Sequence, residues 1–262
     1  MRARISAGER ILDMHRELLK KNEVISETLD ELQRVYDSLD HDLMEAKKLQ
    51  QSLVRRRQKT FPTAELSLLL RSSGHVGGDL VGFYPSGQNH LGLFAIDVSG
   101  HGISSALMTA RLAGYLSASA PDQNVALERL GDGTYRSLPP AKVIEVLNDL
   151  VLDEMETEHY FTLLLADINL ANGEMVWAQA GHPFPAVQRA DGSVEQKGTG
   201  GFPVGLLPNV TFEEDGLEEV MKDLADTKGA AFFDALIWNL TCFAESDDFP
   251  DDISGILFEF NG

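Results

Sequence analysis

An apolar seam runs through the first 53 residues and constrains the fold more than any other feature. Laid out as heptads, it keeps its register without a slip, and ten of its thirteen a and d positions are apolar. A strict 3.5-residue period held over six heptads is typical of a coiled coil, because a one-sided surface helix repeats every 3.6 residues. The d positions are Ile11, Leu18, Ile25, Leu32, Leu39, Ala46 and Leu53, and the a positions are His15, Asn22, Leu29, Tyr36, Leu43 and Gln50.

Asn22 indicates how such a coil is assembled, because two facing amides at an a position hydrogen-bond in a parallel two-stranded register. We therefore expect residues 1–57 to be a coiled-coil dimerisation and linker helix in a parallel homodimer. The alternative is a long helix packed on its own domain, but the remaining chain is too short to cover the seam. Such rods commonly join a sensor to an output module, so a sensor domain upstream is a hypothesis.

Charge and composition change near residues 59–62. Residues 1–60 hold 13 basic and 11 acidic residues, one glycine and no proline, whereas the rest of the chain holds 9 basic and 30 acidic residues. We therefore expect residues 58–262 to form a separate acidic domain. A surface this acidic disfavours nonspecific binding to nucleic acid or to anionic lipid, so we expect neither partner.

Cysteine usage and hydropathy narrow the class of protein further. The one cysteine, Cys242, allows neither an internal disulfide nor a cysteine-rich zinc site. No apolar run approaches the roughly 18 residues of a membrane span, and the first residues contain no apolar signal region. These features predict a cytoplasmic protein.

The acidic domain alternates apolar runs with turns. We expect strands at residues 66–70, 90–98, 160–168, 174–180 and 253–260, a strand or loop at 185–189, and helices at 104–117, 140–155, 217–226 and 230–243. The Asn-Gly pair between the third and fourth strands is a hairpin signal, because it supplies positive φ. Hairpins in place of crossovers predict an α+β fold with antiparallel sheets.

Three Asp-bearing turns are candidate metal sites. They carry Asp79, Asp97, and the pair Asp251 and Asp252. Carboxylates at strand ends beside glycine suit hard, oxygen-seeking cations such as Mg²⁺ or Mn²⁺. An aspartate beside glycine is also a common turn residue that caps its own backbone, so the residues alone leave both interpretations open.

Five motifs in order resemble the stage II sporulation protein E-type phosphatases, the bacterial branch of the type 2C-like, metal-dependent serine/threonine protein phosphatases. They are GGD, IDVSGHGISSALMTA, FTLLLADINLANGEMVWAQAGHPFPAV, GGFPVGLLP and FPDDISGILF, and the resemblance covers roughly residues 60–262. It implies a two-layer antiparallel β-sandwich flanked by helices (αββα), with two Mn²⁺ or Mg²⁺ ions at one edge.

Carried over to this sequence, the resemblance implies that Asp97 bridges both ions and that the backbone carbonyl of Val98 binds one of them. It assigns Asp79 to the second ion, and Asp251 rather than Asp252 as the distal ligand. Two histidines, His101 and His182, lie in the same motifs. His101 is either a general acid or a structural residue of its loop, and His182 is expected to pack a turn.

The sequence departs from the family pattern after residue 214. The family continues with a strand and a Ser-Asp-Gly turn that carries another ligand, whereas here Asp215 follows with no apolar strand before it. Either Asp215 is that ligand or the segment is absent from the chain, which would leave one metal site short of a carboxylate.

Three functional hypotheses follow. The first is a metal-dependent phosphatase acting on Ser or Thr of a partner protein, by resemblance an anti-sigma-factor antagonist of the STAS class, as the output module of a sensor or response regulator. In it, helices 104–117 and 140–155 transmit coiled-coil geometry to Asp97 and Val98. The second is a catalytically impaired pseudophosphatase that acts as a dimeric binding module. The third is a dimerisation rod with a structural head.

Overall fold

The computed structural model describes residues 2–54, 57–87, 89–100, 102–154, 159–189, 192–198, 200–206, 229–244, 249 and 251–261. The chain forms two compact units, Met1–Lys48 and Leu49–Gly262. Expected helix 217–226 and residues His101 and Asp215 lie outside the described ranges. No helix among the described residues is long and apolar enough to span a membrane.

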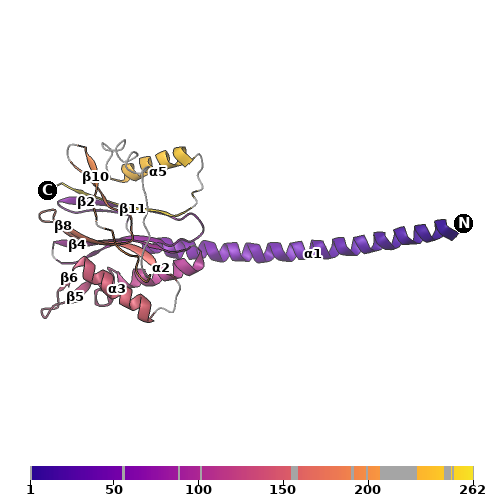
Figure 1. Cartoon of the computed structure of the whole chain (residues 1–262), viewed down its shortest axis with the longest axis horizontal. Coiled ribbons are helices and arrows are strands. Elements are labelled where there is room, and N and C mark those ends of the chain that lie inside the picture. The colour runs from indigo at the N-terminus through magenta and orange to yellow at the C-terminus, as the bar shows by residue number, and fades with distance from the viewer. Residues whose placement is uncertain are drawn as a thin grey trace. The chain divides into compact units, whose positions relative to one another are not determined.

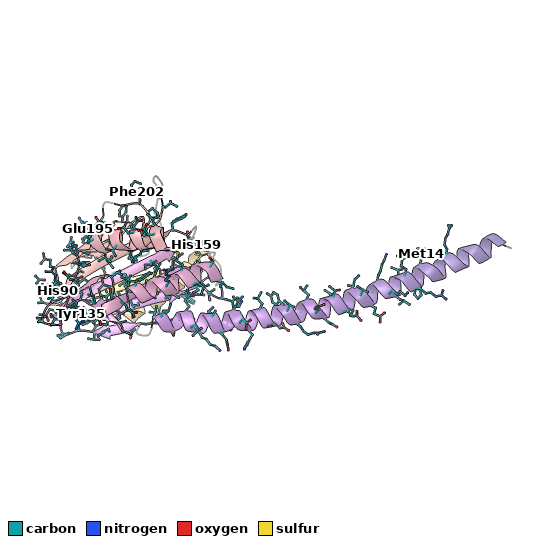
Figure 2. All side chains as sticks on the ribbon, turned by 90° about the horizontal axis from the view of Figure 1, so that it is seen from below. Met14, His90, Tyr135, His159, Glu195 and Phe202 are labelled. Carbon is teal, nitrogen blue, oxygen red and sulfur yellow. The ribbon has the colours of Figure 1, made fainter. Side chains whose placement is uncertain are left out.

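Helix α1 (Arg2–Leu53) confirms the predicted long helix. It contains no proline, and its one glycine, Gly8, is tolerated within the helix. In the single chain the seam is open to solvent over residues 15–39: Leu18, Leu29 and Leu32 expose 56%, 58% and 62% of their surface. Figure 2 shows side chains projecting all round this helix, among them Met14.

Two antiparallel sheets form the centre of the second unit. The smaller has the order β1-β2-β11, from Gln58–Thr60, Ala64–Arg71 and Ile253–Phe260. The larger has the order β3-β4-β7-β8, from Asp79–Pro85, His90–Val98, Phe161–Asn169 and Met175–Ala180. Strands β2 and β11 contact β3 in the other sheet, so the sheets pack face to face.

Helices cover the two outer faces of this sandwich. Helices α2 (Ile103–Tyr115) and α3 (Pro140–Glu154) contact the larger sheet, and α5 (Ala230–Ala244) contacts β2 of the smaller one. Figure 1 shows the resulting layers, with α5 on one side and α2 and α3 on the other. The predicted α+β sandwich flanked by helices is therefore confirmed.

Apolar side chains from both sheets and from α2 and α3 form one continuous core. Ile96, Leu112, Leu147 and Leu163 are fully buried in it. A smaller cluster of Phe232, Phe233 and Leu236 joins α5 to the smaller sheet. Burial of such side chains provides most of the favourable free energy of folding.

Several short elements complete the domain. They are the 3₁₀ helix η1 (Pro121–Gln123), the hairpin β5 (Leu127–Arg129) and β6 (Tyr135–Ser137), and the hairpin β9 (Ala186–Gln188) and β10 (Val194–Gln196). The sequence prediction contained neither β3 as a strand nor the β5–β6 hairpin. Glycines inside both segments made them resemble loops.

Candidate metal centre

Asp79 and Asp97 lie opposite each other on paired strands. Asp79 is the first residue of β3, and its cross-strand partner is Asp97 near the end of β4. Side chains of directly paired residues point to the same face of a sheet, a few ångströms apart. The edge of the larger sheet therefore brings together two aspartates that the sequence separates by 18 positions.

The other sheet brings two more carboxylates to this edge. Asp252 immediately precedes β11, and its Oδ1 accepts hydrogen bonds from the Ser73 N–H (2.7 Å) and Oγ (3.1 Å). Its Oδ2 accepts the Asp79 N–H at 3.3 Å. The Asp251 side chain is exposed, and its Oδ1 accepts the Asp252 N–H. Asp252 is therefore committed to holding the two sheets together, which favours Asp251 as the ligand.

Burial and neighbouring charges raise the pKa values of two aspartates in this cluster. Burial, followed by the charges of Asp97, Asp252 and Asp251, raises the pKa of Asp79 to about 7, against an opposing hydrogen bond from Ser254. Burial, then the charges of Asp251 and Asp252, also raises the pKa of Asp97. The charged forms of Asp79 and Asp97 are disfavoured by burial and by the neighbouring negative charges, and a bound cation would stabilise them.

Gly77 and Gly78 allow the backbone to pass close to these groups. A Cβ on Gly77 would overlap the Asp252 carboxylate, and a Cβ on Gly78 would overlap the carbonyl oxygen of Val98. The Gly78 carbonyl accepts hydrogen bonds from the Val98 N–H (3.3 Å) and from Thr109 Oγ1 (2.7 Å) on α2. The turn before Asp79 therefore sets the position of Val98, whose carbonyl is a metal ligand by the family resemblance.

Gln50, near the end of α1, forms two hydrogen bonds to the same turn. Its Nε2 donates to the Gly77 carbonyl (2.6 Å), and its Oε1 accepts the Gly77 N–H (3.0 Å). The side chain is buried, although the heptad pattern assigned it to the coiled-coil seam. A lone glutamine in a seam carries no signal of this role, so sequence reasoning missed the contact.

His182 contacts the strand next to Asp97. Its Nδ1 is 2.8 Å from the Oγ1 of Thr162, which is the cross-strand partner of Asp97 on β7. Burial lowers the pKa of His182 to about 4, so the ring is neutral at neutral pH. These contacts fit the expected packing role.

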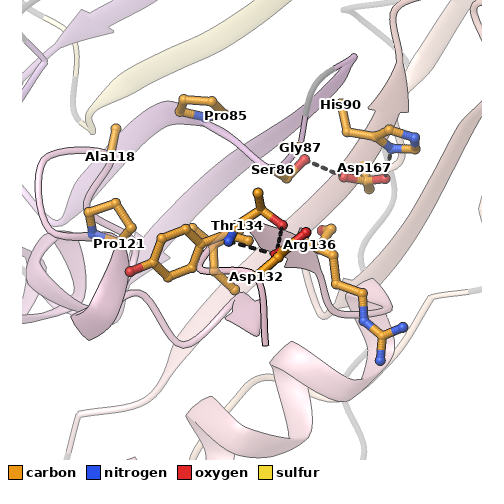
Figure 3. A pocket seen from close by; sticks show the side chains of 13 residues that line it. Pro85, Ser86, Gly87, His90, Ala118, Pro121, Asp132, Thr134, Arg136 and Asp167 are labelled. Atoms are coloured by element: carbon orange, nitrogen blue, oxygen red, sulfur yellow. Dashed lines mark hydrogen bonds and ion pairs between the residues drawn. The ribbon is translucent and has the colours of Figure 1, made fainter. Parts of the chain in front are cut away.

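A cavity of about 700 Å³ lies at the other end of the β3–β4 pair (Figure 3). In its wall, the Asp167 carboxylate accepts the Ser86 Oγ–H (2.7 Å) and lies 2.7 Å from His90 Nδ1. Because the carboxylate lies between the other two groups, the imidazole is not placed to take the serine proton. This trio ties the β3–β4 turn to β7, far from the aspartate edge.

The residues at the aspartate edge suit a divalent cation by their chemistry. Oxygen donors from Asp79, Asp97, Asp251 and the Val98 backbone form the hard ligand set that Mg²⁺ and Mn²⁺ prefer. Within the described part of the chain, no three acidic, histidine or cysteine side chains already converge closely enough to hold an ion. The carboxylates would have to turn toward a cation to bind it.

Comparisons with known proteins agree with this architecture. The chain is 27% identical over 176 residues to phosphoserine phosphatase RsbP of Bacillus subtilis (strain 168), a match that covers 63% of this chain and 40% of RsbP. The chain thus spans less than half of that relative's length.

Two solved structures share the fold. The SiaA-PP2C domain of Pseudomonas aeruginosa has a TM-score of 0.64 at 17% identity, covering 86% of this chain and 98% of that one. RsbX in complex with magnesium has a TM-score of 0.52 at 14% identity, covering 78% and 98%. Residues 87–225, more than half of the chain, match the model of the family described as stage II sporulation protein E (SpoIIE). The chain therefore belongs to the stage II sporulation protein E family.

Proposed function

We propose that this chain is a metal-dependent phosphatase that removes phosphate from serine or threonine of a partner protein. The observation that carries the proposal is the gathering of Asp79, Asp97 and Asp251 at one sheet edge in a member of this family. The similarity to RsbP, a phosphoserine phosphatase, supports the same reaction class.

In this proposal Asp97 would hold the two Mn²⁺ or Mg²⁺ ions together with Asp79 and Asp251, and the Val98 carbonyl would supply a further oxygen. When bound, such ions make hydroxide available from water and screen the charge of the phosphate ester. The residues around them keep the ligands in place. Asp252 holds the β3 start against β11, and Gly78 leaves the Val98 carbonyl uncovered.

Electrostatics make the cation indispensable in this scheme. The domain carries 9 basic against 30 acidic residues beyond position 60, so it repels a dianionic phosphate. No Arg or Lys lies in the GGD, IDVSGHG or DDIS motifs. Cations held by the carboxylates would therefore offset this repulsion.

The test is Mn²⁺-dependent release of phosphate from a phosphoserine protein by the purified chain. We expect Asp97→Asn to abolish turnover. The matched control is Asp234→Asn on α5, which makes the same charge change on an exposed residue of another face and should leave turnover intact. Undiminished turnover in Asp97→Asn would refute the proposal.

The substrate we propose is a phosphorylated anti-sigma-factor antagonist of the STAS class, in a cytoplasmic partner-switching pathway. Residues 58–262 then form the phosphatase domain, and residues 1–57 link it to a sensor or response regulator as a parallel homodimer. The open apolar seam of α1 supports the dimer, because a second copy would cover it. Phosphorylated STAS proteins offered beside an unrelated phosphoprotein test the substrate class.

A catalytically impaired, dimeric binding module is the second candidate. It is favoured by the sequence around residue 214, where the expected Ser-Asp-Gly turn is missing and Asp215 is the candidate for its ligand. Calorimetric titration separates the two candidates, because a binding module should take up no Mn²⁺ above background.

A further inference from the structure

His159 joins three segments near the aspartate edge. Its Nδ1 is 2.8 Å from the carbonyl oxygen of Ser99, and its Nε2 is 2.6 Å from Oγ of Ser104 on α2. A carbonyl only accepts, so Nδ1 carries the proton, and in the neutral ring Nε2 accepts the Ser104 Oγ–H. The imidazole therefore links the start of β7 to the loop after β4 and to the first turn of α2.

The loop that His159 contacts is the one that presents the Val98 carbonyl. Ser99 follows Val98 directly, and its N–H donates to the Tyr160 carbonyl (2.9 Å). The Ser99 hydroxyl oxygen accepts the Tyr160 N–H (3.1 Å). Residues 159 and 160 thus hold Ser99 through three hydrogen bonds, two to its backbone and one to its side chain.

Two glycines in the same loop give its backbone conformational freedom, which the contacts of His159 restrict. Gly100 and Gly102 have φ of 83° and 88°, a region in which glycine is far less restricted than other residues. Gly102 at the N-cap of α2 provides no side-chain cap. A Cβ on Gly100 would lie 3.6 Å from Cε1 of His159, so the imidazole also packs directly against the loop.

We propose that His159 is a positioning residue that fixes residues 98–100 and thereby sets the metal affinity of the site. It touches neither metal nor substrate in this role, and it acts through the position of the Val98 carbonyl. The inference rests on the proposed metal-dependent function. It goes beyond that function because it assigns control of metal affinity to a side chain that is not one of the proposed metal ligands.

The experiment compares His159→Ala, which removes both ring hydrogen bonds, with His159→Asn, whose amide nitrogen can still donate to the Ser99 carbonyl. We expect His159→Ala to weaken Mn²⁺ binding about tenfold by calorimetry, the scale of one to two hydrogen bonds. His159→Asn should recover most of that loss. Half-saturating Mn²⁺ in phosphatase assays should rise in parallel, with kcat at saturating Mn²⁺ close to that of the unmodified chain.

The matched control is His90→Ala at the opposite end of the domain, where Figure 2 shows His90 far from His159. It also removes a histidine hydrogen bond, here to Asp167, and should leave Mn²⁺ affinity unchanged. If His159→Ala lowers the melting temperature like the control and leaves Mn²⁺ affinity unchanged, His159 is merely structural and the inference is wrong.

A measurement without metal separates this inference from the proposed function. In EDTA, hydrogen exchange of peptides covering residues 97–104 should speed up in His159→Ala and recover in His159→Asn. If the unmodified chain binds no Mn²⁺, the proposed function and the effect on metal affinity both fall. Unchanged exchange in His159→Ala overturns the inference even if the phosphatase function holds.

Discussion

Asp79 makes the metal-free domain sensitive to pH. Its pKa is raised from 3.8 to about 7, so between these values the folded state binds a proton that the unfolded state has released. The contribution of Asp79 to stability must then fall as pH rises from about 4 to about 7. In EDTA, we expect the urea midpoint of the unmodified chain to drop across this range, whereas Asp79→Asn loses that part of the slope. Parallel curves for the two proteins would contradict the raised pKa.

Gly78 offers a steric test of the same edge. In Gly78→Ala the new methyl group overlaps the Val98 carbonyl oxygen, so the backbone has to shift at a proposed metal ligand. We expect Mn²⁺ affinity to fall at least about tenfold, as for a loss of about 1.4 kcal/mol. Gly74→Ala is the matched control, because its Cβ meets its nearest atom at an ordinary 3.9 Å. Equal Mn²⁺ affinities in the two variants would exclude this role for Gly78.

Among the secondary-structure elements, the sequence predicted those whose formation depends on local apolar periodicity and turn residues. The β7–β8 hairpin, the helices at 103–115 and 140–154 and the last strand follow from apolar periodicity and turn residues. Strand β3 does not, because Gly82 within it suggests a loop. Its place becomes clear only in three dimensions, since a Cβ at Gly82 would overlap the ring of Phe94, its cross-strand partner. The glycine leaves room for an aromatic ring that packs across the strands.

The same limit applies to the site. The sequence and its family resemblance named Asp79, Asp97 and Asp251, and the structure brings these carboxylates to one edge. The supports were not foreseen, because Gln50, Thr109 and Ser73 contact the site through backbone groups. A hydrogen bond to a backbone amide or carbonyl requires no particular residue type at the other end, so it leaves no motif.

Gln50 is the support most open to test. Gln50→Leu keeps the approximate size of the side chain but leaves the buried Gly77 N–H and carbonyl without their partner. We expect a loss of about 1–3 kcal/mol in unfolding free energy and weaker Mn²⁺ binding. The control is Gln51→Leu at the exposed neighbouring position. A Gln50→Leu protein with unchanged melting temperature and Mn²⁺ affinity would show that the contact is dispensable.

For the molecule as a whole, we propose that a second copy covers the exposed seam of α1. Leu29 and Leu32 each expose more than half of their surface, and burying one leucine is worth about 1.5–3 kcal/mol. Leu29→Glu with Leu32→Glu should therefore turn a dimer into a monomer by sedimentation equilibrium. Ser38→Glu, a charge added off the seam on the same helix, should remain dimeric. A chain that is monomeric before any substitution would rule out the dimer.

The direction of the coil can be tested with a cysteine at one end of the seam. In a parallel, in-register pair, residue 18 of one copy faces residue 18 of the other, whereas an antiparallel pair of such long helices separates them by many turns. Leu18→Cys, combined with Cys242→Ser to remove the native thiol, should therefore form an interchain disulfide under mild oxidation. The dimer that persists without forming this disulfide would be antiparallel or out of register, and Asn22 would then not set the alignment that its a position predicts.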